Sequence, residues 1–505
     1  MNRLKIVIAA LLAVITCLSV FAGCQNKPEE TKPASTAKET ETDTVEVTET
    51  EPAETYYIPT AKFGGDVFRV LCPGVSDNEW ECKDFFAEED SDDPVASAVY
   101  QRMTLLEDKF GIKFELVDNA SRSSIGSLVK KDITSGDKEY DLVMQVISNA
   151  YTLAQSGYLM NLDSIPYLDL KSDVWDQSYL EQSSIGGINY FATGEITTMD
   201  NDATWVMMFN KKLASNLDLD IYSLVKNNEW TFDKLLELSK DFYEDVNSNA
   251  EVDEKDKFGI ATTIDFIQGL FYAADARIIK KDNADTPYLD VNTERNLSII
   301  DKMIDIYYAK NRVTFDCHDF THVNPAAHLI AQQMFEEDRA LFYSEVMQCA
   351  IRLREMETDY GIIPLPKFDT NQKNYTTHTV AGVTLCAMVT SNMKGDTNKL
   401  ERAGMVMQAL AVEGKNILTP AYYEKSLKTK GARDAESYDM LPIIFANRTC
   451  DIGYMAEDAS VSSLFSAMRN MVKKGNNELA SITKKNQTKI NKALTKMITA
   501  FDKYK

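Results

Sequence analysis

The chain has 505 residues, with 77 acidic and 54 basic side chains and a formal net charge of −23 at pH 7. This acidity argues against a nucleic-acid-binding function, because phosphate contacts require a basic surface. The length exceeds what one hydrophobic core normally covers, so we expect more than one lobe.

The amino-terminal segment has the features of a secretory signal. Arg3 and Lys5 precede an apolar run over residues 6–20, and Phe21-Ala-Gly-Cys24 follows. A basic start, a short apolar run and small residues before the cut are typical of a signal peptide, and the run is short for a membrane span. Its end resembles a bacterial lipobox, with Phe21 where Leu is usual. The resemblance implies cleavage before Cys24 and its acylation, for example with palmitate. An ordinary signal peptide and a membrane anchor are the alternatives.

The segment after the signal is predicted to be a disordered tether over residues 24–60. From Gln25 to Thr55 the sequence consists mainly of Glu, Thr, Pro, Lys and Ala, with almost no large apolar side chain. Such a segment cannot bury enough surface to offset its ordering entropy. We expect it to hold a folded body away from the membrane.

Alternating strand and helix patterns follow the tether. The run Val67–Leu71 is typical of a strand, and residues 94–110 have an apolar face at helical spacing that ends at Gly111. Residues 112–117 form the next apolar run, and this alternation predicts a parallel sheet. Trp80, in the loop after the first strand, is a candidate for stacking on a sugar, or it could plug the surface of the lobe.

A third strand leads into the first candidate ligand-binding residues. Leu142–Met144 is a short apolar run, and the polar residues Gln145, Ser148 and Asn149 follow it before a helical segment that ends at Gly157. Ligands in open α/β sheets bind at the carboxyl ends of strands. These three side chains are therefore predicted to face a ligand, with helix capping as the alternative.

The same stretch resembles the loop of the extracellular solute-binding proteins that include maltose-binding protein, with Ala154–Gly157 matching their Ala-Gln-Ser-Gly. The resemblance extends over most of the chain after residue 64. It implies an α/β, periplasmic-binding-protein-like fold of type II, with two lobes, mixed and mainly parallel sheets, and three crossings. Phe209–Lys211 corresponds to the family's first crossing, Tyr360–Pro366 to the second, and the region near Thr419 to the third.

The crossings divide the chain into segments. We expect a signal peptide over residues 1–23, the tether over 24–60, a first lobe formed by 61–202 plus 361–417, and a second lobe formed by 203–360 plus 418–505. The last helix, Leu479–Phe501, has an apolar stripe with lysines outside it. That pattern predicts docking of this helix on the second lobe.

The resemblance also indicates which residues face the cleft between the lobes. Asp202 precedes the first crossing, where a carboxylate can accept hydrogen bonds from sugar hydroxyls, although a turn would explain it too. Tyr343, Ser344 and Glu345 follow the strand that delivers residues into the family's cleft. The complete candidate set is Trp80, Gln145, Ser148, Asn149, Asp202, Tyr343, Ser344 and Glu345.

The loop Asp245–Asp256 has the spacing of an EF-hand calcium loop, in which alternate oxygens converge on one cation. Two positions depart from the pattern, because Ala250 replaces the turn glycine and Asp256 replaces the bidentate glutamate. A structural Ca²⁺ is therefore a candidate cofactor, although none is required, and an acidic surface loop is the alternative. The candidate ligands are Asp245, Asn247, Asn249, Glu251 (through its backbone), Asp253 and Asp256.

The remaining cysteines are scattered. Cys72 and Cys82 are the only close pair, and a disulfide between them is permitted outside the membrane. Three histidines lie near Cys317, but Asn324-Pro325 separates them, so surface positions are favoured over a metal site.

These observations favour a lipid-anchored binding protein on the extracellular face of the cell membrane. We expect a monomer that is not an enzyme and that delivers a small ligand, most readily a sugar or oligosaccharide, to an ABC transporter permease. A secreted carbohydrate-active enzyme with paired carboxylates is one alternative, but no nucleophile motif, His–Glu metal signature or eightfold strand–helix repeat is present. A surface binding protein without a transport role is the other.

Overall fold

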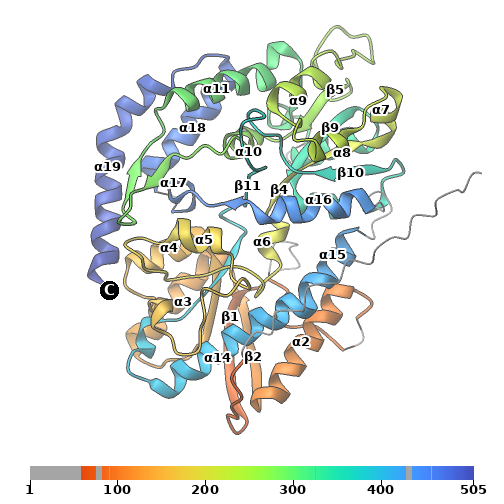
Figure 1. Ribbon diagram of the computed structural model, residues 1–505. Coiled ribbons are helices and arrows are strands. Elements are labelled where there is room, and N and C mark those ends of the chain that lie inside the picture. The colour runs from red at the N-terminus through yellow and green to blue at the C-terminus, as the bar shows by residue number, and fades with distance from the viewer. Residues whose placement is uncertain are drawn as a thin grey trace, which may run out of the picture. The chain divides into compact units, whose positions relative to one another are not determined.

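The computed structural model describes residues 58–74, 82–89, 91–324, 326–427, 435–456 and 458–504. Tyr56–Lys505 forms one compact unit (Figure 1). The predicted signal peptide, the lipidation site Cys24, most of the tether and Trp80 lie outside the described residues. None of the helices in the described ranges combines the length and the apolar composition needed to cross a bilayer.

The first sheet has the strand order β12-β3-β1-β2. Strand β1 runs parallel to both β2 and β3, whereas β12 is antiparallel to β3. All five residues of β3 are buried, as expected for a strand covered on both faces. The strands are β1 (Asp66–Pro73), β2 (Ile112–Ala120), β3 (Leu142–Val146) and β12 (Leu385–Met388). Helices α2 (Pro94–Phe110), α3 (Arg122–Ser135), α4 (Ile147–Gln155), α5 (Gln177–Ser183), α14 (Thr397–Glu413) and α15 (Thr419–Leu427) belong to this region.

Helix α2 shows how local sequence sets an element of this lobe. Asp93 caps its first turn, since one carboxylate oxygen accepts from the backbone N–H groups of Val95 and Ala96 at 2.9 and 3.1 Å. Pro94 occupies the first turn, where its missing N–H has no helical partner to lose. Gly111 ends the helix in the left-handed region at φ 60°. The predicted limits of this helix are confirmed.

The second sheet has the order β10-β4-β9-β5-β8. Strand β5 is parallel to β8 and β9, whereas β4 is antiparallel to β9 and β10. The strands are β4 (Trp205–Asn210), β5 (Phe258–Thr262), β8 (Thr314–Asp316), β9 (Ala340–Val346) and β10 (Tyr360–Ile363). The helices of this region are α7 (Lys211–Asn216), α8 (Ile221–Lys226), α9 (Phe232–Ser239), α10 (Phe266–Ala273), α11 (Glu294–Tyr307), α12 (His328–Glu336), α13 (Met347–Arg352), α16 (Ala435–Ala446), α17 (Ile452–Met455), α18 (Ala459–Lys474) and α19 (Leu479–Lys503). A mixed α/β fold with one large mixed sheet in each lobe is thus confirmed.

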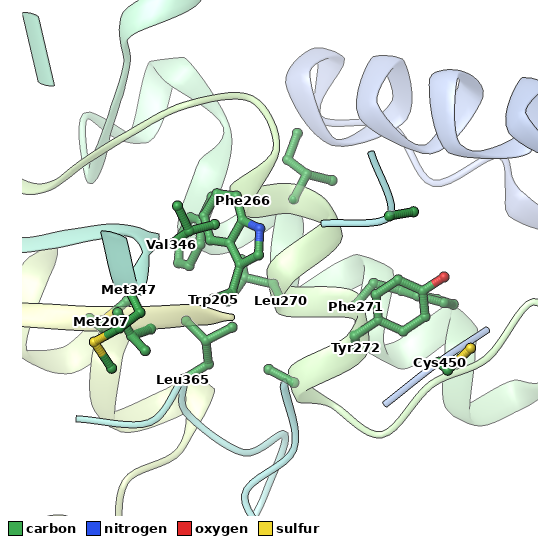
Figure 2. Packing of buried hydrophobic residues seen from close by; sticks show 14 of the residues in the cluster. Trp205, Met207, Phe266, Leu270, Phe271, Tyr272, Val346, Met347, Leu365 and Cys450 are labelled. Carbon is green, nitrogen blue, oxygen red and sulfur yellow. The ribbon is translucent and has the colours of Figure 1, made fainter. Parts of the chain in front are cut away.

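The core of the second lobe forms where β4 meets α10. Trp205, at the start of β4, lies beside Phe266 and Leu270 of α10 (Figure 2). The Trp205 ring also stacks on His378 with 5.8 Å between ring centroids and 10° between planes. Trp205 therefore packs against both a helix and a crossing segment.

Strand pairing shifts the expected crossings. Phe209–Lys211 was expected to mark the first crossing, but it lies at the end of β4 and the start of α7 in the second lobe, so this crossing comes before Trp205. Two other lobe boundaries come later than expected. Strand β10 pairs with β4, so Tyr360–Ile363 belongs to the second sheet and the crossing follows it. The segment then runs through β11 (Thr377–His378), which pairs with β13 (Arg448–Thr449). Helix α15 (Thr419–Leu427) packs on α2 of the first lobe, where Lys425 forms an ion pair with Asp93 at 2.6 Å. The third crossing therefore follows α15.

Helix α19 contacts both lobes. It packs against α18 and against β7 (Pro287–Leu289), which forms a hairpin with β6 (Ile279–Lys281). At its other end, the ring of Phe501 lies 5.1 Å from Tyr190 and 6.3 Å from Tyr151 of α4, between centroids. The expected docking on the second lobe is thus only part of its packing.

Candidate functional site

A cavity of about 460 Å³ lies between elements of the two lobes. Its walls come from the segment before α2, from α2 itself, from the first crossing, and from α13 and α15. The lining is mostly polar or charged. It consists of Lys83, Asp84, Asp93, Val95, Thr198, Met199, Asp202, Gln348, Ile351, Arg352, Tyr422 and Lys425.

Asp84 holds the first crossing against the first lobe. Its carboxylate accepts hydrogen bonds from the hydroxyls of Thr197 and Thr198 at 2.5 and 2.9 Å, and from the backbone N–H of Thr198 at 3.0 Å. Asp84 is 2% exposed. The backbone oxygen of Asp84 also accepts from buried Arg102 of α2. These bonds position the short helix α6 (Met199–Asp202), which ends at the cavity.

Asp202 presents its carboxyl group to the cavity. Burial raises its pKa to about 7, and the hydrogen bond from Tyr422 offsets part of that rise. The Tyr422 hydroxyl donates to this carboxylate at 2.7 Å. Asp202 therefore titrates near neutral pH, and it can donate as well as accept when protonated.

The ion pair between Asp93 and Lys425 forms another side of the cavity. Burial alone would raise the pKa of Asp93, but Lys425 and the N–H groups of α2 lower it overall. Asp93 is therefore a charged acceptor at neutral pH. Lys83 lies nearby on the same wall and is exposed.

The second lobe contributes its wall through the turn from β9 into α13. The backbone N–H of Met347 donates to Thr204 of the first crossing at 2.8 Å, which joins α13 to α6. Gln348, Ile351 and Arg352 of α13 then line the cavity. Burial lowers the pKa of Arg352. This wall thus offers an amide and a guanidinium group to a ligand.

Arg448 joins the crossing segments at residues next to Asp202 in the sequence. From β13 its guanidinium contacts Asp200 at 2.9 Å, Asp176 at 3.1 Å and the Asn201 amide oxygen at 2.9 Å. Burial raises the pKa of Asp200 to about 7, and Arg448 offsets part of this effect. All three charged side chains are at most about a tenth exposed. The arrangement is a buried charge cluster shared by two crossings.

The predicted residues after β3 do not line this cavity. Gln145 is fully buried, and its amide donates to the backbone oxygen of Arg122 at 2.9 Å. Asn149 donates to the same oxygen at 3.2 Å. Ser148 is 4% exposed, and its backbone N–H points to Ala381. These side chains connect the starts of α3 and α4, and no side chain caps the first turn of α4, so the capping alternative is not met either.

The predicted residues of β9 also lie outside the cavity lining. Tyr343 and Ser344 are buried, and the Ser344 hydroxyl donates to Val206 of the neighbouring strand at 3.1 Å. Glu345 is partly buried, and desolvation raises its pKa to about 7. One Glu345 oxygen accepts from the following backbone N–H at 2.7 Å. The Tyr343 and Ser344 side chains thus pack within the second lobe, while the Glu345 carboxyl group remains titratable.

Of the described candidate residues, the structure brings Asp202 alone to the cavity. Whether the others contact a ligand stays a prediction, and Trp80 lies outside the described residues. The sequence patterns did not select Asp84, Asp93, Gln348, Arg352, Tyr422 or Lys425 as binding residues. One signal was available, because Tyr422 lies in the Thr-Pro-Ala-Tyr-Tyr-Glu stretch near the third crossing.

The predicted calcium loop is closed by hydrogen bonds among its own side chains. One Asp253 oxygen accepts from Asn247 and Asn249 at 2.9 and 2.7 Å, and an Asp245 oxygen accepts from the N–H of Ala250 at 2.9 Å. Ala250, at the glycine position of the pattern, has φ 62°. The backbone thus makes the turn that the pattern requires, without glycine.

Asp256 is the buried end of this loop. It is fully buried, and one oxygen accepts from the Tyr243 hydroxyl at 3.0 Å. The other oxygen has no hydrogen-bond partner among the described residues. The Glu251 side chain is exposed, consistent with a backbone role. The loop therefore offers a buried carboxylate oxygen in addition to exposed ones.

One further group of potential metal ligands occurs in the described ranges, formed by Asp316, Cys317 and His318. Other protein groups already form hydrogen bonds and an ion pair with these side chains. The backbone N–H of Ile264 donates to His318 Nδ1 at 3.2 Å, and Lys473 pairs with Asp316 at 2.7 Å. The contacts explain its arrangement without an ion.

Residues 96–311 match the family model described as bacterial extracellular solute-binding protein. No curated protein matches the chain.

Solved structures share the fold at low sequence identity. A cyclo/maltodextrin-binding protein complexed with maltotetraose has 13% identity and a TM-score of 0.53, over 88% of this chain and 98% of that chain. The maltose-binding periplasmic protein MalE from Listeria monocytogenes, in complex with maltose, has 16% identity and a TM-score of 0.52, over 87% and 99%. An ABC substrate-binding protein from the same organism, in complex with cycloalternan, has 11% identity and a TM-score of 0.51, over 86% and 100%. Residues 96–311 thus match the bacterial extracellular solute-binding family, and the chain has the fold of the maltose-binding proteins, as the sequence resemblance predicted.

Proposed function

We propose that this chain is a lipid-anchored extracellular binding protein that captures a carbohydrate and delivers it to an ABC import permease. The observation that carries the proposal is the polar cavity of about 460 Å³ between the two lobes. Its volume lies in the range of small-ligand sites, roughly 300–1,000 Å³. The family model and the matching structures describe binding proteins, and three of those structures contain oligosaccharides.

The lining has the groups that bind hydroxyl-rich molecules. Asp84, Asp93 and Asp202 supply carboxyl oxygens that accept hydrogen bonds, whereas Arg352 and Lys83 donate. Because walls from both lobes line the cavity, a ligand there gains contacts when the lobes close on it. Closure then distinguishes the loaded protein from the empty one, which is the state a permease must recognise.

Ligand binding is tested by thermal shift with an oligosaccharide library, followed by calorimetry. A ligand that binds only the native state at 100 times its Kd raises the free energy of unfolding by about 2.7 kcal/mol. In Arg352→Ala the Kd of that ligand should increase about tenfold or more, since a buried polar partner loses its hydrogen bond. Lys130→Ala, an exposed change away from the cavity, is the control. Equal affinities in the two variants would argue against this cavity as the binding site.

Anchoring at the membrane is proposed from the Ala-Gly-Cys24 sequence. Acylation at Cys24 would retain the folded body at the extracellular face through the tether over residues 24–60. Cys24→Ala should release the protein into the medium, as measured by membrane fractionation. Retention of the variant would contradict the anchor and leave the binding function untouched.

We also propose that the loop Asp245–Asp256 binds a structural Ca²⁺. Hard oxygen donors are the ligands that this ion prefers, and Asp256 has a buried oxygen without a partner among the described residues. Calorimetry with CaCl₂ should show binding that Asp245→Ala weakens. No heat of binding in the native protein would rule the site out.

A further inference from the structure

The outer face of α19 carries a row of lysines. Lys485, Lys489, Lys492 and Lys496 are all exposed and follow one another at spacings of four, three and four residues. At 3.6 residues per turn these spacings place the four side chains on one face. The buried residues Ile490, Leu494, Met497 and Phe501 form the opposite stripe. The row therefore points away from the body of the protein.

This face contrasts with the charge of the whole chain. The formal net charge of the protein is −23, yet residues 479–501 contain five lysines and no acidic residue. No ion pair within the described part of the chain involves the four lysines of the row. Other lysines do form such pairs, as Lys473 does with Asp316 and Lys425 does with Asp93. The row is a concentrated positive surface on an acidic protein.

The fold itself gains nothing from this arrangement. Like charges three and four residues apart on a helix repel each other and weaken it. The helix is held instead by its apolar stripe, which packs on α18 and β7 and ends with Phe501 against Tyr151 and Tyr190. A surface with phosphate groups would neutralise the row and remove this repulsion.

The position of α19 leaves the cavity accessible when such a surface is bound. In Figure 1, α19 runs along one side of the described unit, whereas α2 and α15 lie on the opposite side. Helix α2 and its cap residue contribute Val95 and Asp93 to the cavity lining, and α15 contributes Tyr422 and Lys425. Contacts through the lysine row therefore do not cover the ligand-binding walls.

We propose that the lysine row of α19 docks this protein on an anionic phospholipid bilayer. The charges of the row and of the headgroups are complementary, and each lysine near such a surface adds to the attraction. Docking would hold the body with α19 against the headgroups and the cavity away from them. The contact is electrostatic, because the exposed face has no large apolar side chain to insert.

The test uses the chain from Gln25 to Lys505, which contains every described residue and lacks the proposed lipid. Co-sedimentation is measured with phosphatidylcholine vesicles, with and without about one third phosphatidylglycerol, at ionic strengths from about 0.05 to 0.3 M. We expect binding to the anionic vesicles only, with affinity that falls as salt rises. Replacing all four lysines of the row with glutamine should weaken this binding at least about tenfold. Glutamine is a good helix former, so circular dichroism should be unchanged.

Two further variants separate the row from net charge. Lys130, Lys131, Lys171 and Lys240 are exposed lysines elsewhere, and their joint replacement with glutamine changes net charge equally. This control should keep its vesicle affinity, and replacing the row with arginine should also keep it. The proposal is overturned if the native chain does not bind anionic vesicles, including the case in which it binds soluble polyglutamate but no vesicles. It is also overturned if the two glutamine variants lose vesicle affinity equally. The assay requires neither Cys24 nor a ligand, so its failure would leave the proposed transport function standing.

Discussion

Two neighbouring carboxyl groups at the first crossing have different surroundings. Asp200 contacts Arg448 at 2.9 Å inside a buried cluster, whereas Asp202 accepts from Tyr422 and faces the cavity. Burial raises the pKa of both to about 7. Asp200 therefore belongs to the connection between the crossings, and Asp202 belongs to the proposed binding site. Sequence alone could place both aspartates before the first crossing. It could not identify their partners, because Arg448 and Tyr422 each lie more than 200 positions further along the chain.

The raised pKa of Asp202 predicts a pH-dependent stability. An aspartate with an unfolded pKa near 3.9 and a folded pKa of about 7 binds its proton more tightly in the folded state. Its contribution to stability is therefore complete below about pH 4 and is lost as pH rises through about 7. Asp202→Asn should remove this loss. Between pH 5 and pH 8, the free energy of unfolding of the variant should therefore rise by about 1–2 kcal/mol relative to that of the native protein. Urea unfolding at both pH values measures it, with exposed Asp137→Asn as control.

Two buried thiols predict a disulfide in an oxidising compartment. Cys72 and Cys82 are both buried free thiols, and the hydrogen bond between the Cys82 thiol and Cys72 raises the pKa of Cys82. Thiols in contact can form a bond that closes a short loop, which stabilises a protein by about 2–3 kcal/mol. Mass spectrometry after alkylation should find the pair protected without reductant and modified after reduction under denaturing conditions. Modification of both thiols in unreduced, denatured protein would contradict the disulfide.

At the scale of elements, patterns with strong local signals agree with the structure. The predicted α2 has its cap at Asp93 and its stop at Gly111, and the predicted strand at Leu142 is β3. Elements that depend on distant partners were harder to assign. Strand β10 was expected near a boundary of the first lobe, yet it pairs with β4. Its partner is set by sheet geometry, which local periodicity does not contain.

The loop Asp245–Asp256 also shows what local sequence patterns leave out, here the backbone conformation of a turn. Its spacing predicted the positions of the oxygen donors, and the structure adds that Ala250 takes a left-handed conformation. That conformation costs an L-residue roughly 1–2 kcal/mol, while glycine adopts it freely.

Ala250→Gly should therefore strengthen the proposed calcium site. The turn would form without strain, although the added freedom of glycine in the unfolded chain offsets part of the gain. We expect a Kd for Ca²⁺ that is about two- to fivefold lower, corresponding to roughly 0.5–1 kcal/mol. Calorimetry measures it, and exposed Gly395, also at positive φ, provides a matched Gly395→Ala control with unchanged calcium affinity. An unchanged or weaker affinity in Ala250→Gly would contradict the predicted role of the turn.

At the scale of the whole molecule, separate contacts join the two lobes. On the cavity side, α13 and α6 are connected through Met347 and Thr204. At the crossings, Arg448 of β13 contacts Asp176 and Asp200. At the far end of α19, Phe501 packs on Tyr190. The family resemblance predicted two lobes and three crossings, but these contacts could not be predicted, because each joins side chains far apart in sequence.

The Arg448 cluster is the most charged of these connections. Removing one partner from a buried cluster leaves the others without compensation, which costs about 3–5 kcal/mol. Arg448→Met preserves much of the side-chain length but leaves Asp176 and Asp200 without their cation, so the free energy of unfolding should fall by about that amount. The loss should be smaller at pH 5 than at pH 8, because protonation of Asp200 below its pKa of about 7 removes the uncompensated charge. Urea unfolding at both pH values measures the effect, and Lys240→Met is the exposed control. Equal destabilisation at the two pH values would show that Arg448 contributes packing rather than charge compensation at the crossings.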